Sequence, residues 1–219
     1  MNLAEFLCWA PMVADRVQFP EFMYHLGVMM GKQLVGPNET NPRGHFEDLE
    51  FRQLLYRCRT DGSVIKDLKA KIDARFFTHK LWGVKEPALL EVIMALGQYL
   101  QGRNYKLILT QRDPIACTRS YRRKWPNSNV DQVHNHIVNM LEQRKMFIDT
   151  YPQEVLCIDF NKLTDQPERI VYEIVHFIFG ERPHIFEKRV WPSDKQIQSS
   201  IDFIEPELNH HLEHETPLK

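Results

Sequence analysis

The stretch that decides the fold is KLILTQRDPIACTRSYRR, residues 106–123. Its first part, Lys106–Thr110, is a short apolar run of the kind found in a buried parallel sheet. Asp113 can then cap a helix, because Pro114 stands at the first helical position, where a missing N–H does no harm. The stretch therefore predicts a strand that leads through a tight turn into a helix.

Working outward, similar units stand on both sides of this stretch. Apolar runs at 80–85 and 155–159 predict further buried strands. Helical spacing follows each strand: one helix opens at Pro87 and ends by Gly102, a second covers about 131–150, and a third runs from Pro167 to Gly180 with Asp165 as its cap. This alternation predicts an α/β fold with a central parallel sheet and helices on both faces, a three-layer α/β/α arrangement.

The first 80 residues are less regular. Phe6–Ala10 predicts an opening strand and Pro20–Met30 a helix, while residues 36–44 carry the Pro, Asn and Gly typical of turns. We expect one domain over residues 1–219, with a polar tail after about residue 205.

Composition excludes several classes of function. The chain has 219 residues and a formal net charge of -1, whereas a general nucleic-acid binder usually carries a basic excess. Its four cysteines are scattered without metal-site or disulfide-framework spacing, which favours a reducing compartment. The opening residues lack a basic segment and no apolar run could span a bilayer. We therefore expect a soluble, cytoplasmic protein without nucleic-acid or membrane partners.

An anion site is predicted at the end of the strand 106–110. Arg112 follows that strand just before a helix N-terminus, where exposed N–H groups and the helix dipole favour negative charge. A guanidinium group binds phosphate well, and Ser120, two turns into the helix, can donate a hydroxyl to the same group. The alternative is a solvated basic helix face with an arginine that merely pairs with a carboxylate. The further cations of this helix are Arg119, Arg122, Arg123 and Lys124.

The string Gln111–Arg123 resembles the 3′-phosphate-binding segment of the sulfotransferase family. In that family an arginine ends a strand, and a serine eight residues later joins it on the 3′-phosphate of 3′-phosphoadenosine 5′-phosphosulfate (PAPS). Arg112 and Ser120 match this spacing. The resemblance implies PAPS as co-substrate and a P-loop NTPase-like fold.

Three further stretches are similar to the same family and come in the same order. Gly36–Asp48 resembles the NPxGxFED segment of bacterial-type sulfotransferases, and Trp82–Pro87 resembles their WGxKDP strand. Asp159–Pro167, with Phe177–Gly180, resembles the strand, loop and helix that read YExLxxDP…FLG. Together the four stretches place the resemblance over roughly Tyr24 to Gly180.

The sequence departs from the family at the loop that cradles the 5′-phosphosulfate. That loop is expected near Met12–Val17, which reads MVADRV and has no Gly, Ser or Thr. Glycine lets backbone N–H groups close around a phosphate, so its absence weakens the cradle, and Arg16 is the nearby cation that could substitute. Three explanations stay open: a rebuilt loop that uses Arg16, an incomplete N-terminus, or a relative that binds the nucleotide without transferring sulfate.

Candidate catalytic residues follow the strand 80–85. Lys85 can stabilise the leaving phosphate and Glu86 can take the proton of the acceptor, unless the two form a pair that only closes the sheet edge. His45, with Glu47 and Asp48 beside it, is an alternative base or acceptor contact, although a surface histidine is the simpler interpretation.

Two late features complete the predicted site. The resemblance implies that Lys188 and Arg189 cover the nucleotide as a basic loop. His210 and His214 stand four residues apart, but with no third ligand in the sequence we expect a solvated tail and no metal.

We expect a sulfotransferase that acts on a hydroxyl or amine of a small molecule or glycan. A non-catalytic nucleotide-binding or interaction protein on the same scaffold is the alternative. A kinase-like phosphoryl transferase is disfavoured, because the chain has no GxxxxGK[ST] loop. The acceptor and the oligomeric state stay open.

Overall fold

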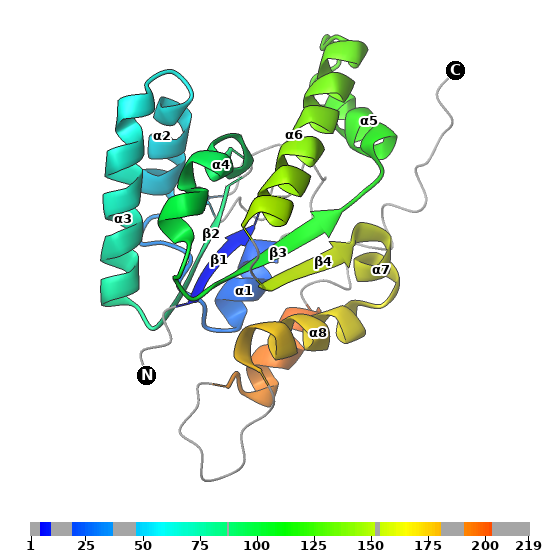
Figure 1. Cartoon of the computed structure of the whole chain (residues 1–219). Coiled ribbons are helices and arrows are strands. Elements are labelled where there is room, and N and C mark those ends of the chain that lie inside the picture. Colours follow the sequence, from blue (N-terminus) through cyan, green and yellow to red (C-terminus); the bar gives the residue numbers. More distant parts are fainter. Residues whose placement is uncertain are drawn as a thin grey trace.

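The computed structural model describes residues 5–9, 19–36, 47–86, 88–151, 154–180 and 191–202. Four strands of this part form a parallel sheet in the order β2-β1-β3-β4 (Figure 1). The strands are β1 (Glu5–Trp9), β2 (Leu81–Lys85), β3 (Tyr105–Gln111) and β4 (Glu154–Asp159). The α/β class and the parallel sheet predicted from the sequence are confirmed.

Helices connect these strands and dominate the described part of the chain. Before β2 come α1 (Phe19–His25), α2 (Leu49–Cys58), the short 3-10 helix η1 (Gly62–Val64) and α3 (Ile65–Thr78). After β2 come α4 (Leu89–Leu100), α5 (Pro114–Lys124), α6 (Val130–Thr150), α7 (Phe160–Asp165) and α8 (Pro167–Phe179). A last helical stretch covers residues 194–202.

Side-chain caps start several of these helices. Asp113 accepts a hydrogen bond from the backbone N–H of Ala116 at 2.9 Å, and Pro114 is the first residue of α5, as predicted. Gly180, at a φ of 76°, ends α8, also as predicted. Asn129 caps α6 by accepting from the N–H of Gln132 at 3.0 Å.

Two predicted boundaries are wrong. Asp165 does not cap α8: it is the last residue of α7, a short helix that Asp159 caps, and α8 begins after Gln166 without a side-chain cap. The helix predicted over Pro20–Met30 ends at His25, because the chain turns at Gly27, at a φ of 84°, and then runs alongside β2.

Side chains of β3 alternate between two apolar cores. Leu107 and Leu109 pack with residues of α2, α3, α4 and α6, whereas Ile108 packs with residues of α1, α8 and the stretch 194–202. Figure 1 shows α3, α4 and α6 to one side of the sheet and α8 to the other. Strand periodicity of two is what sends neighbouring residues into different cores. Packing from both sides holds the strand ends in place.

The strand order shows from which two neighbouring strands the chain continues to opposite sides. From β1 the chain passes to β2, on one side, and from β3 it passes to β4, on the other side. In open parallel sheets a ligand crevice forms outside the carboxyl ends of two such neighbouring strands. The topology therefore predicts a ligand site at the carboxyl ends of β1 and β3.

Gly97 marks the place where α4 comes closest to the end of α6. A Cβ atom at this position would overlap the ring of Tyr151. We predict that Gly97→Ala lowers the free energy of unfolding by about 1–3 kcal/mol, because α4 or the ring must shift. Urea denaturation measures the change. Gly62→Ala, where an added Cβ meets nothing within 4 Å, is the control. A Gly97→Ala protein as stable as the original chain would contradict this packing.

Candidate functional site

The carboxyl ends of the four parallel strands meet at one edge of the sheet. Lys85 ends β2 and Glu86 follows it, Arg112 follows β3, and Phe160 follows β4 as the first residue of α7. The fold thus places three of the candidate residues, Lys85, Glu86 and Arg112, at the same edge.

Arg112 lies between the end of β3 and the start of α5. Its guanidinium carbon stands 4.4 Å from the centre of the Phe160 ring, a cation–π contact that restricts where the group can move. Its Nη1 atom is buried and has no hydrogen-bond partner within the described residues. Buried donors are normally satisfied, so this atom keeps an unused capacity to donate a hydrogen bond.

The N-terminus of α5 supplies only part of such a site. Pro114 has no N–H group, and the N–H of Ala116 already donates to the carboxylate of Asp113. An anion at this turn must therefore be held mainly by side chains, of which Arg112 is the nearest cation in sequence. This makes Arg112 more important than the helix end itself.

Ser120 lies on the buried side of α5. A rise of about 1.5 Å per residue places it about 9 Å along the helix axis from Pro114. Its neighbour Thr118 is engaged, because its hydroxyl donates to the carbonyl of Pro114 at 2.8 Å and lies 3.2 Å from His134 Nδ1. Shared binding of one phosphate by Arg112 and Ser120 stays a prediction.

The other cations of α5 differ in their surroundings. Arg119 is exposed, whereas Arg122 has a buried Nε atom that lacks a partner within the part of the chain described. On α5, Arg119 therefore faces solvent, whereas Arg122 is only partly exposed.

On the β2 side, Glu47 joins two cations. Its Oε1 atom lies 2.6 Å from Lys85 Nζ, and its Oε2 atom lies 3.3 Å from Nη1 of Arg52, on α2. Glu47 is 5% exposed, and its ion pair with Lys85 is mostly shielded from water, whereas Arg52 is partly exposed. The carboxylate of Glu47 is therefore occupied, which disfavours it as a base.

Glu86 is the most unusual carboxyl group of the described chain. It is only 2% exposed, its Oε1 atom accepts from the N–H of Ala88 at 3.3 Å, and its Oε2 atom has no partner among the described residues. Burial, and next the charge of Glu47, raise the pKa of Glu86 from 4.5 to about 7, although Lys85 and Arg52 act in the opposite direction. A carboxyl group with this pKa can both accept and release a proton at neutral pH.

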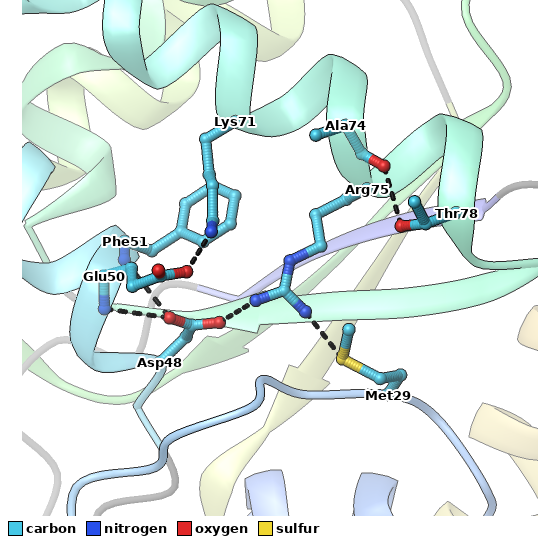
Figure 2. A network of polar contacts seen from close by, with 8 residues as sticks. All are labelled: Met29, Asp48, Glu50, Phe51, Lys71, Ala74, Arg75 and Thr78. Carbon is cyan, nitrogen blue, oxygen red and sulfur yellow. Dashed lines mark hydrogen bonds and ion pairs between the residues drawn. The ribbon is translucent and has the colours of Figure 1, made fainter.

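Asp48 has a structural task. Figure 2 shows its carboxylate between Arg75, of α3, and the first turn of α2. It accepts from the N–H of Glu50 at 2.9 Å and from the N–H of Phe51 at 3.3 Å, and it forms an ion pair with Arg75. Both partners of the ion pair are almost fully buried. Asp48 is thus occupied, and it anchors the start of α2 directly after Glu47.

Several predicted residues lie outside the described ranges. They are Arg16 with the loop Met12–Val17, His45, Pro87, Lys188, Arg189 and the tail after residue 205. Within the described ranges, no group of three His, Cys, Asp or Glu side chains is arranged to hold a metal ion. The helices among those residues are all too short or too polar to cross a membrane.

Sequence reasoning missed two residues of the site. Phe160, which faces the Arg112 guanidinium, directly follows a predicted strand. Because parallel strands end at the same edge of a sheet, its position near Arg112 could have been predicted. Arg52, on α2, carried no such signal, because its pairing with Glu47 depends on how α2 packs against the end of β2.

No protein-family model matches this sequence, and no curated protein is significantly similar to it. A solved structure, the sulfotransferase domain from the curacin biosynthetic pathway, is similar in fold, with a TM-score of 0.50. The two chains are 12% identical, and the alignment covers 99% of this chain and 93% of that chain. The chain thus has a sulfotransferase-like fold, and at this identity the similarity concerns the fold alone.

The pKa of Glu86 predicts how stability depends on pH. A pKa raised by folding means that the protonated form stabilises the fold below about pH 4.5, and that this stabilisation is lost as the pH rises through about 7. Relative to Glu86→Gln, the original chain should lose on the order of 3 kcal/mol of unfolding free energy between pH 4.5 and pH 8. Urea denaturation across this range measures the difference. Parallel curves for the two proteins would contradict the raised pKa.

The buried ion pair of Asp48 predicts a large loss on substitution. Asp48→Ala should lower the free energy of unfolding by about 3–5 kcal/mol, because Arg75 stays buried without a counter-charge. The control is Glu50→Gln, which removes the exposed ion pair with Lys71 from the same network and should cost less than about 1 kcal/mol. Equal losses in both variants, measured by urea denaturation, would show that Asp48 does not anchor α2.

Proposed function

We propose that this chain is a sulfotransferase that transfers a sulfuryl group from PAPS to a hydroxyl or amine acceptor. The observation that carries the proposal is the buried Nη1 atom of Arg112, which lacks a partner in the described structure and stands at the end of β3. The sulfotransferase-like fold supports it. A three-layer, P-loop NTPase-like classification is part of the same proposal, supported by the two apolar cores and the parallel strand order.

In this proposal Arg112 binds the 3′-phosphate of the nucleotide. A guanidinium group forms paired, charge-assisted hydrogen bonds with phosphate oxygens, and the ring of Phe160 holds its plane in one orientation. Ser120 contributes its hydroxyl from α5. Arg16 substitutes for the family's missing loop at the 5′-phosphosulfate, and Lys188 and Arg189 cover the nucleotide, as the family resemblance implies for these two.

The transfer itself requires a base and neutralisation of the leaving group. The acceptor oxygen attacks sulfur while the bond from sulfur to the phosphate oxygen breaks, roughly in line. Glu86 takes the acceptor proton, for which a pKa of about 7 is well suited. Lys85 has three ammonium protons, of which one is directed to Glu47, so another can approach the leaving phosphate. His45 stays the alternative base.

A non-catalytic nucleotide-binding protein on the same scaffold is the second candidate. The segment Met12–Val17 favours it, because a loop without Gly, Ser or Thr offers a poor cradle for the 5′-phosphosulfate. Incubation with labelled PAPS and a panel of alcohol and amine acceptors separates the two candidates. Transfer of label supports the enzyme, whereas nucleotide binding without transfer to any acceptor supports the binding protein.

The role of Arg112 predicts the behaviour of its alanine variant. Arg112→Ala should weaken binding of 3′-phosphoadenosine 5′-phosphate by about 10- to 100-fold, because charge-assisted hydrogen bonds are lost. Isothermal titration calorimetry measures the affinity. The matched control is Arg119→Ala, which removes the same charge from the exposed side of α5 and should change the affinity little.

Two outcomes would contradict the proposal. Equal losses in the two arginine variants would mean that the nucleotide responds to overall charge and not to a site at Arg112. Tighter binding of ATP than of the bisphosphate would exclude both the sulfotransferase and the non-catalytic relative.

A further inference from the structure

Four charged residues meet where β2 ends, and we call them the β2-edge cluster: Glu47, Arg52, Lys85 and Glu86. They come from three parts of the chain, namely the residue pair before α2, α2 itself and the end of β2. Both oxygens of Glu47 are engaged by cations, at 2.6 Å and 3.3 Å. Glu86, in contrast, has one oxygen without a partner in the described part of the chain.

The two carboxyl groups of the cluster compete for the same two cations. Lys85 is the residue directly before Glu86, and Arg52 also acts on the charge of Glu86. If either cation paired with Glu86, the carboxylate would be held in its ionised form and would be a weak base. The geometry shows the opposite arrangement, with both cations on Glu47 and the backbone N–H of Ala88 as the hydrogen-bond donor to Glu86.

We propose that Glu47 is a positioning residue for Glu86: it holds the ammonium group of Lys85 and the guanidinium group of Arg52 on its own carboxylate, which leaves Glu86 Oε2 available to the acceptor. This inference rests on the proposed function, in which Glu86 is the base. Glu47 itself does not contact the reacting atoms. Its carbonyl accepts from the N–H of Val35 at 2.8 Å, and the ion pair of its neighbour Asp48 with Arg75 anchors the start of α2.

The proton and electron balance of the transfer is simple under this arrangement. The acceptor O–H bond breaks and its proton goes to Oε2 of Glu86, while the oxygen forms the new bond to sulfur. The bond between sulfur and the phosphate oxygen breaks, and its electron pair stays on that oxygen. The products are the sulfate ester, 3′-phosphoadenosine 5′-phosphate and a protonated Glu86, which releases its proton to water at neutral pH.

The test is a pH titration of Glu86 in the full chain and in Glu47→Gln. The carboxyl carbon of Glu86 is followed by NMR, with its signal assigned from the Glu86→Gln variant. The substitution removes one negative charge and releases two cations, so the titration midpoint should fall from about 7 by about one pH unit or more. Glu47→Asp keeps the charge and should move the midpoint back toward that of the original chain.

A second variant keeps the inference testable if Glu47→Gln does not fold. Arg52→Gln removes one cation and should raise the midpoint of Glu86, because Arg52 stabilises its ionised form. Arg57→Gln, an exposed arginine of the same helix, is the matched control and should leave the midpoint unchanged. An unchanged midpoint in Glu47→Gln, or in Arg52→Gln, overturns the inference.

The titration separates this inference from the proposed function. If the midpoint shifts as expected and the original chain transfers labelled sulfate, the pH profile of transfer should move down in Glu47→Gln together with the midpoint. A shifted midpoint in a chain that transfers no sulfate supports the charge arrangement and counts against the enzyme. A profile that does not follow the midpoint would mean that Glu86 is not the base, and the positioning role fails with it.

Discussion

The ion pair between Asp48 and Arg75 holds α2 and α3 together on the side of the molecule where Glu86, the candidate base, lies. Asp48 joins the first turn of α2 to α3, and Arg75 also contacts Met29 Sδ at 2.6 Å, in the stretch that runs alongside β2. Three segments are therefore held at the edge of the sheet by one pair of buried charges. Breaking such a pair leaves an uncompensated charge in the core, so the arrangement has few low-energy alternatives. Glu47, one residue earlier, is also held by its own backbone, because its carbonyl accepts from the N–H of Val35 at 2.8 Å.

The sheet topology gives the site two chemically different halves. At the end of β3, Arg112 presents a buried guanidinium atom suited to an anion, and at the end of β2, Glu86 presents a buried carboxyl group with a pKa of about 7. Both strands lie next to β1 in the sheet. A sulfuryl transfer needs both kinds of group, an anion-binding part for the nucleotide and a proton acceptor for the second substrate. This combination is the reason for preferring the enzyme over the binding protein.

Much of this arrangement could be predicted from local signals. The unit 106–123 was predicted as strand, cap and helix because Asp113 and Pro114 act within a few residues of each other. The predicted end of α1 and the predicted cap of α8 were wrong. The glycine turn after α1 and the short helix α7 before α8 depend on contacts with the sheet. The ion pair between Glu47 and Lys85 was not predicted, for the same reason. The two residues are 38 positions apart, and the sequence around either of them does not indicate that they pair.

The proposed site at Arg112 should recognise the 3′-phosphate of its nucleotide. Comparing the affinities of 3′-phosphoadenosine 5′-phosphate and adenosine 5′-phosphate tests it most directly, because the two ligands differ in that group alone. The bisphosphate should bind at least about tenfold more tightly, as expected for charge-assisted hydrogen bonds to one more phosphate. Equal affinities of the two nucleotides for the full chain would contradict it.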